Sequence, residues 1–226
     1  MSLREKLEWA IGERHFPLWG IAGSVVGLVF VLGAQIPYTG VYGEPFSMLN
    51  HFVSELGELG VSEFAFLFNS GMILAGLIFI PFMIGLGLYM DNIVSKIAGA
   101  VGVFSAMAIF FVGIFPMNYL AEHTMAAMSF FFSGMIMVGL WTIAILLQEQ
   151  VKIHKGFSFG GVINLVIFLL FLYGPWESVE DLSTRPDIWM VPTLEWGIYF
   201  AIGGYLLVLS VFVWNKEKRH RVTQSL

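Results

Sequence analysis

The chain has 226 residues, of which 58% are hydrophobic and only 12% are charged, and its formal net charge at pH 7 is −5. Its mean hydropathy of +0.81 is too high for a protein that hides its apolar side chains in one water-soluble core. The absence of cysteine excludes thiol nucleophiles, disulfides, Cys-ligated zinc and iron–sulfur clusters. No basic patch of the kind that binds nucleic acid is found. The composition therefore predicts a membrane protein without a nucleic-acid partner.

Six apolar stretches are long enough to cross a hydrocarbon core of about 30 Å. They cover residues 17–36, 64–90, 97–115, 122–147, 157–174 and 194–214. The first follows basic residues, as a signal peptide does, but its apolar run is too long and lacks a clear small-residue cleavage site. No repeat or linker divides the chain. We therefore expect an all-α polytopic membrane protein with six transmembrane helices in one domain, residues 1–226.

Basic residues predict the orientation of these spans. Ten of the eleven Lys and Arg residues lie in the two tails and in alternate connections, and only Arg185 lies in the others. The positive-inside rule assigns the ten to the cytoplasm. We expect both termini to be cytoplasmic in a multi-pass protein of the cell membrane, and the lack of a targeting signal favours a prokaryotic inner membrane.

Acidic residues collect on the opposite, extracytoplasmic side. They are Glu44, Glu55, Glu58, Glu63, Glu122, Glu177, Glu180, Asp181, Asp187 and Glu195. Three tryptophans on that side, Trp176, Trp189 and Trp196, are expected to anchor the protein in the membrane interface.

The connection between the first two spans carries the strongest functional signal. Residues 45–60 are amphipathic at helical period and predict a short extracytoplasmic helix. One face collects Ser47, Asn50, His51, Ser54, Glu55 and Glu58, and the other collects Phe46, Leu49, Phe52, Val53, Leu56 and Leu59. We expect the polar face to turn inward, as one wall of a site. The alternative is a helix that lies in the headgroup layer with its polar face in water.

Glycines and isolated polar residues describe the interior of the bundle. Gly23-x-x-x-Gly27, Gly156-x-x-x-Gly160 and the pairs Gly99/Gly102 and Gly203/Gly204 predict close helix contacts. The main polar residues at the helix centres are Asn69, Ser105, Thr142 and Asn164, none of them charged. No span contains the Lys that a retinal Schiff base requires, and no series of carboxylates crosses the membrane as in a proton pump.

Ionisable groups instead meet at the outer ends of the spans. Candidate catalytic residues are His51, Ser54, Glu55 and His123: a His serves as general base to Ser54 or to water, and a carboxylate orients its ring. The same region offers a divalent metal, zinc for example, the ligands His51, Glu122, His123 and Glu195. Candidate substrate contacts are Asn50, Asn69, Asn118 and Trp196.

Structural roles compete with these assignments. Glu122 and Glu195 lie near helix N-termini, where the helix dipole favours acids. His123 is equally compatible with an interfacial histidine bonded to a neighbour. Neither H-E-x-x-H nor G-x-S-x-G occurs, so no motif supports a protease or an α/β-hydrolase.

Short motifs resemble those of a prokaryotic family of six-span membrane proteins with no assigned function. They are Ser54-Glu-Leu-Gly57, Phe68-Asn-Ser-Gly71, Gly113-Ile-Phe-Pro116 and His123-x-x-x-Ala127. The arrangement also resembles, more distantly, the Frag1/DRAM/Sfk1 group, although Phe52-Val53 stands where that group has Tyr-Ile. The resemblance implies six helices and a shared site near Ser54, Asn69 and His123. Some members of the wider group remodel membrane-anchored glycolipids, and others are membrane regulators. Alkaline ceramidases are a still more distant likeness, and their His-x-x-x-His pair is absent here.

These observations predict an outer-leaflet polar cavity that binds a membrane lipid or another amphipathic molecule. The leading hypothesis is lipid modification by hydrolysis or acyl transfer. A non-catalytic lipid-binding, scaffold or regulatory protein is the alternative, and a small-solute transporter is the third. Substrate, metal content and oligomeric state are not predicted by these residues.

Overall fold

The computed structural model describes residues 2–175 and 182–224, and within them all regular secondary structure is helical. Four expectations, for Trp176, Glu177, Glu180 and Asp181, lie outside the described residues. The elements are α1 (Leu3–Ile11), α2 (Phe16–Gln35), the 3₁₀ helix η1 (Val53–Gly57), α3 (Ala65–Tyr89), α4 (Ile93–Ile114), α5 (Leu120–Leu146), α6 (Phe157–Tyr173), the 3₁₀ helix η2 (Leu182–Thr184) and α7 (Met190–Gln224).

Helices α2 to α7 correspond to the six expected spans. Five are long and apolar enough to cross a membrane, and α6, with 17 residues, is a shorter apolar helix. The chain is therefore an all-α polytopic membrane protein. Its ends differ from expectation in two places: α1 precedes the first span, and α7 continues ten residues beyond position 214 into a polar tail. Hydropathy missed both segments because neither is apolar.

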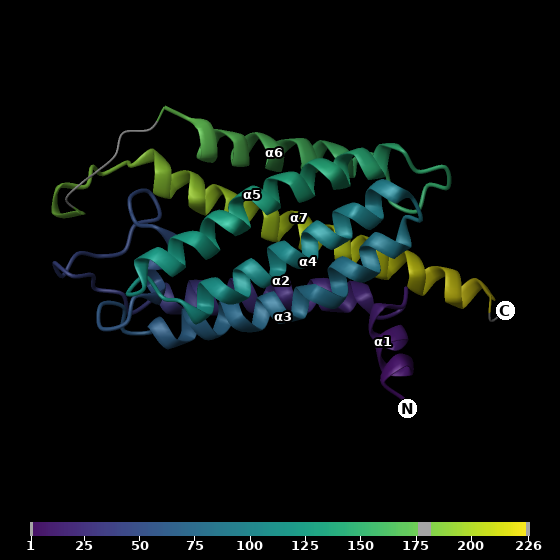
Figure 1. Cartoon of the computed structure of the whole chain (residues 1–226), viewed down its shortest axis with the longest axis horizontal. Helices are drawn as coiled ribbons and strands as arrows, with labels where there is room; N and C mark the ends of the chain where they lie inside the picture. Colours follow the sequence, from purple (N-terminus) through teal and green to yellow (C-terminus); the bar gives the residue numbers. More distant parts are fainter. Residues whose placement is uncertain (1, 176–181, 225–226) are drawn as a thin grey trace.

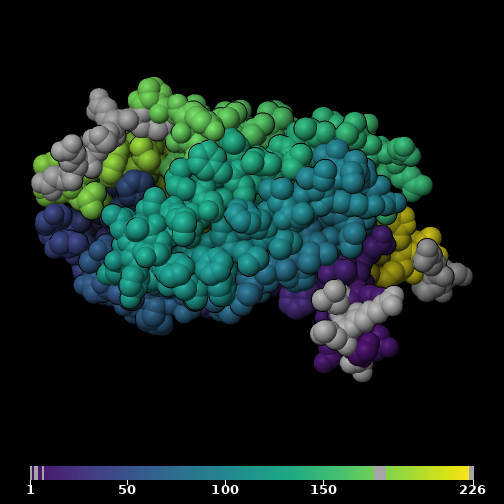
Figure 2. Space-filling view, viewed as in Figure 1, coloured from purple at the N-terminus to yellow at the C-terminus, as the bar shows by residue number. Residues whose placement is uncertain are grey.

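Each long helix packs against the next along the chain, and α7 returns to pack against α2, which closes a ring of six helices. Figure 1 shows the helices running along one common direction, with α1 projecting from the end where both termini lie. The connections 36–64, 115–119 and 182–189 gather at the opposite end, which we call the loop end. Figure 2 shows side chains of α4 and α5 covering much of one face between these two ends.

Residues 45–60 turn their polar groups inward but do not form the expected helix. His51, Ser54 and Glu55 are buried as expected, but Val53 and Leu56 of the apolar face are buried as well, while Leu49 and Leu59 are exposed. Helical structure is limited to the five-residue η1. One reason is local: the Ser47 hydroxyl accepts from the backbone N–H of Leu49, and such side-chain bonds compete with the backbone bonds of a helix. The Glu55 carboxylate accepts from the backbone N–H of Phe52 and caps the start of η1.

Only some of the glycines make the expected close contacts. A Cβ on Gly99 would lie 2.9 Å from the carbonyl oxygen of Met83 and 3.2 Å from the Cα of Gly87, so α3 and α4 cross closely there. The expectation is wrong for Gly27, Gly203 and Gly204, where an added Cβ meets no atom within 4 Å. These three glycines border open space.

The two outer tryptophans that the structure describes, Trp189 and Trp196, do not form an interface belt. Trp189 and Trp196 are 8% and 3% exposed, respectively. Trp189 packs edge-on against Phe52, and the indole N–H of Trp196 donates to the carbonyl oxygen of His51. Both side chains attach the loop end to α7 instead of facing lipid headgroups.

Candidate functional site

A buried ion pair joins two connections at the loop end. Arg185, in the connection before α7, places Nη1 3.0 Å from Oε2 of Glu55 in η1, and the side chains are 9% and 4% exposed. Burial removes both charges from water, so further hydrogen bonds are needed to stabilise them. Glu55 also accepts from the backbone N–H of Phe52 and the hydroxyl of Tyr38, while Arg185 donates to the carbonyl oxygens of Asn50 and Leu182. Glu55 is therefore a structural centre of the loop end.

Further hydrogen bonds join the segment before α3 to the start of α7 and to the residues just before it. The Trp189 N–H donates to the carbonyl oxygen of Leu49, and the amide of Asn50 donates to that of Pro186. The Glu195 carboxylate accepts from the backbone N–H of Val53 at 2.8 Å. Segment 49–55 is thus held against the start of α7.

His51 belongs to this attachment. Its Nδ1 lies 2.7 Å from Oδ1 of Asn50, and its Nε2 faces the Glu44 carboxylate at 3.6 Å without a hydrogen bond. Burial lowers the pKa of His51, and Arg185 lowers it further, while Glu55 and Glu44 act in the opposite direction. Burial thus favours the neutral form of the ring, which packs against Phe46 and Tyr38.

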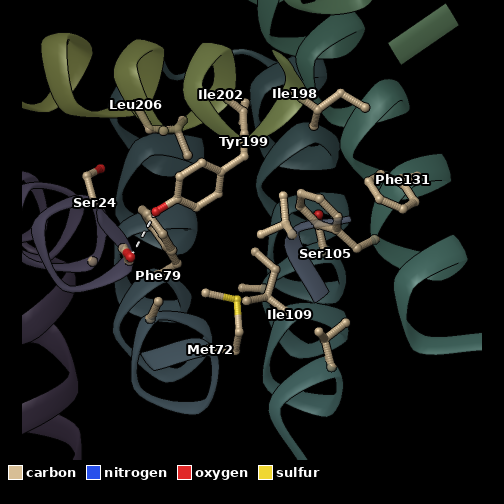
Figure 3. A pocket seen from close by; sticks show the side chains of 18 of the residues that line it. Ser24, Met72, Phe79, Ser105, Ile109, Phe131, Ile198, Tyr199, Ile202 and Leu206 are labelled. Carbon is tan, nitrogen blue, oxygen red and sulfur yellow. Dashed lines mark hydrogen bonds between the residues drawn. The ribbon is translucent and has the colours of Figure 1, made fainter. Parts of the chain in front are cut away.

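A cavity of about 260 Å³ occupies the interior of the helix ring. Its walls are mostly apolar and come from α2, α3, α4, α5, α7 and η1. Figure 3 shows Met72, Phe79, Ile109 and Ile202 among the side chains that surround it. Along α7 the lining runs from Glu195 to Leu206, a length of about 16 Å at 1.5 Å per residue.

Three polar side chains line this cavity from elements at the loop end: Ser54 of η1, His123 near the start of α5 and Glu195 near the start of α7. The Nδ1 of His123 lies 2.7 Å from the carbonyl oxygen of Phe115. A carbonyl only accepts, so this bond assigns the ring proton to Nδ1 and leaves Nε2 as an acceptor in the neutral ring. The cavity is consequently mostly apolar along its length, and its two ionisable residues with acid–base groups, His123 and Glu195, lie toward one end.

The other candidate residues lie elsewhere. Neither His51 nor Glu55 lines the cavity. Asn69 donates to the carbonyl oxygen of Gly57, and Asn118 exchanges two hydrogen bonds with the backbone of Leu59. These two amides fix the connection 57–60. Like the side chains of Asn50 and Trp196, they are hydrogen-bonded to the backbone of the protein.

The expected metal ligands do not come together. Glu122 is exposed on α5, His51 faces Glu44, and Glu195 is bonded to Val53. Among residues 2–175 and 182–224, no group of three or more His, Asp or Glu side chains is arranged to hold a metal ion. His51, Glu122, His123 and Glu195 are therefore not gathered around one point among the described residues.

Sequence reasoning missed the roles of three residues. Arg185 carried a signal, as the one basic residue outside the tails and alternate connections. Tyr199 donates from α7 to the carbonyl oxygen of Gly27 in α2 and lines the cavity, which no local pattern indicates. The Ser105 hydroxyl also lines the cavity, is buried and has no hydrogen-bond partner in the described part of the chain. A buried unpaired hydroxyl of this kind costs about 1–3 kcal/mol.

Residues 17–215 match the family model described as protein of unknown function DUF998. The chain belongs to this family. No curated protein and no solved structure matches it. The matched region covers α2 to α6 and most of α7 and excludes α1.

The motif residues of this DUF998 protein meet at the loop end. A Cβ on Gly57 would lie 2.5 Å from Oδ1 of Asn69, and one on Gly113 would lie 2.5 Å from the carbonyl oxygen of Asn69. Phe115 orients His123. These positions thus bring η1, α3, α4 and α5 together around the polar end of the cavity.

Removal of the Arg185 charge should destabilise the loop end strongly. Arg185→Met leaves Glu55 buried without its counter-charge, and we expect a loss of about 3–5 kcal/mol in unfolding free energy. The exposed pair Lys96–Asp91 is a control, because Lys96→Met should cost no more than about 1 kcal/mol. Unfolding in detergent, followed by tryptophan fluorescence, measures both. Equal losses would contradict the structural role, and Glu55→Gln combined with Arg185→Met should recover part of the loss.

The loop end should also weaken in mild acid. Because burial lowers the pKa of His51, the unfolded chain binds more protons than the folded chain just below the ordinary His pKa of about 6.5. Folded-state stability is therefore present above this pH and declines below it. Proteolysis of segment 44–56 at pH 7.5 and pH 5.5 measures the effect. His51→Gln should reduce the pH dependence, and an identical profile in both proteins would refute the assignment to His51.

Proposed function

We propose that this DUF998 protein binds a lipid or another amphipathic molecule inside its helix bundle. The ligand's apolar chain lies in the central cavity, and its polar group lies against Ser54, His123 and Glu195. The observation that carries the proposal is the form of this cavity, which is apolar along α7 and polar at the loop end. Pockets with apolar walls and a few convergent polar groups are typical of ligand sites.

The distribution of Lys and Arg residues supports one orientation of the proposed site in the membrane. Ten Lys and Arg residues lie at the end of the bundle that holds both termini, and Arg185 lies at the loop end. The positive-inside rule then places the termini in the cytoplasm and the polar end of the cavity in the outer leaflet. A prokaryotic inner membrane is the proposed location. A transporter is less well supported, because its site is typically built from interrupted helices, whereas α3 is continuous through Pro81.

Filling the cavity should displace the ligand. Ile109→Trp adds volume to a side chain that lines the cavity, whereas Ile136→Trp adds the same volume on an exposed face of α5. Native mass spectrometry of protein purified in mild detergent should find a bound lipid in the wild type and in Ile136→Trp. Its occupancy should fall about tenfold or more in Ile109→Trp. If the wild type carries no lipid, or if both variants retain it equally, the cavity is not the binding site.

Ester hydrolysis or acyl transfer is a second candidate, favoured by the tautomer of His123. Nε2 of His123 is an acceptor, and Ser54 lines the same cavity. In this reaction Nε2 takes the hydroxyl proton while Oγ of Ser54 bonds to the ester carbonyl carbon. The ester C–O bond breaks, and the departing alcohol oxygen receives the proton. Water or a second alcohol then releases the acyl group by the same steps. The likeness to the Frag1/DRAM/Sfk1 group remains a prediction.

Turnover of an ester lipid separates the two candidates. Ser54→Ala and His123→Gln should each lower turnover by about a hundredfold or more, while bound lipid persists. Ser62→Ala is the matched control, because Ser62 is a buried serine of the loop end that does not line the cavity. Release of the fatty acid from a glycerolipid, followed by mass spectrometry, is the measurement. If the wild type releases none, or if the variants match it, the protein is not an esterase or acyltransferase of this kind.

A further inference from the structure

Helices α2 and α7 touch at one level and separate at another. A Cβ on Gly20 of α2 would collide with the hydroxyl oxygen of Ser210 in α7, so the two backbones are close there. Two turns further toward the loop end, a Cβ on Gly27 meets no atom within 4 Å, and the same holds for Gly203 of α7. We call the space bordered by Gly27 and Gly203 the α2–α7 gap. It exists because both helices lack a side chain at this level.

The central cavity extends into this gap. Successive residues of an α-helix point about 100° apart, so the lining residues of α7 can be followed around its circumference. Ile198 and Ile202 lie on the inner face, Tyr199 and Gly203 on the face toward α2, and Phe200 on the outer side. All five line the cavity, and Phe200 is 41% exposed on the outside. The cavity therefore passes between α2 and α7 and reaches the outer surface of the bundle.

The gap lies deep within a membrane-spanning helix. Gly203 follows the first residue of α7, Met190, by thirteen positions, which corresponds to about 20 Å along the helix. At this depth the surroundings of a membrane protein are hydrocarbon and not water. The gap therefore faces the hydrocarbon of the bilayer and not water.

The unpaired hydroxyl of Ser105 points independently to a ligand. This side chain is 2% exposed, lines the cavity and has no hydrogen-bond partner among the described residues. Ser24, another cavity residue, satisfies its hydroxyl by donating to the carbonyl oxygen of Gly20. Ser105 thus leaves one donor within an otherwise apolar wall. An ester or ether oxygen is the matching acceptor, and glycerolipids carry such oxygens next to their chains.

We infer that the ligand is a glycerolipid of the surrounding membrane, which inserts one hydrocarbon chain sideways through the α2–α7 gap. This inference rests on the proposed function and adds the ligand class and its route. Tyr199 controls the route. Its hydroxyl donates to the Gly27 carbonyl oxygen across the gap at 2.9 Å, as the dashed line in Figure 3 shows. Release of this bond lets the ring move and widens the gap.

Photo-crosslinking tests the route. The protein is placed in nanodiscs with phosphatidylcholine that carries a diazirine on one acyl chain, and labelled peptides are mapped by mass spectrometry. Gly27→Leu and Gly203→Leu fill the gap. Gly139→Leu is the matched control, because a Cβ on this glycine of α5 contacts only Leu165 at 4.0 Å and lies outside the cavity. Labelling of Ile109 and Ile202 should fall about tenfold or more in the two gap variants and stay at the wild-type level in the control.

The outcomes separate the route from the proposed function. If both gap variants are labelled as strongly as the wild type, the acyl chain does not enter between α2 and α7. Binding of the acyl chain in the cavity would still be supported. If the wild type shows no label inside the cavity, the proposed function itself is wrong. Tyr199→Phe removes the bond to Gly27 without added volume, so it provides a test that does not depend on tolerance of leucine. Its rate of cavity labelling should rise about tenfold, and an unchanged rate would overturn the role of Tyr199.

Discussion

The buried pair of Glu55 and Arg185 determines how the loop end is built. Two charges withdrawn from water destabilise a fold unless each is paired and its remaining hydrogen-bonding capacity is satisfied. Here the backbone N–H of Phe52 and the hydroxyl of Tyr38 donate hydrogen bonds to Glu55, and Arg185 donates hydrogen bonds to two carbonyl oxygens. The pair joins the connection before α3 to the connection before α7. Its position fixes η1, and with it Ser54, over one end of the cavity.

Glycine has two opposite uses in this bundle. In a bilayer, helices gain little from burying apolar surface against one another, so close backbone contact contributes more of their association. Gly99 against Gly87 serves that purpose, as does Gly113 against Asn69. Gly27 and Gly203 leave space instead, because the helices at their level do not approach closely enough to fill it. The same residue type therefore tightens one part of the ring and opens another, and only three-dimensional context distinguishes the two.

The membrane constraint explains which features were predictable. Span positions follow from length and hydropathy, so α2 to α6 end within a few residues of their expected limits. Amphipathic pattern likewise predicted that His51, Ser54 and Glu55 turn inward. The pattern predicted a continuous helix where only the short η1 forms, and the Ser47 hydroxyl, which accepts from the nearby N–H of Leu49, competes with helix formation there. The sequence pattern of any one segment could not predict which residues come together at the cavity. Ser54 and His123 line one cavity because five helices and η1 surround it. His51 lies outside this cavity, next to Asn50 and Glu44.

The distribution of polar groups supports the proposal of an amphipathic ligand over a purely apolar one. A cavity meant only for hydrocarbon would need no ionisable residue, and each buried one carries a desolvation cost. Yet His123 and Glu195 both line this cavity, and both are oriented by backbone groups, the carbonyl of Phe115 and the N–H of Val53. Both residues lie near the loop end of an otherwise mostly apolar cavity. A molecule with a polar group at one end and a chain at the other satisfies both parts of the cavity together.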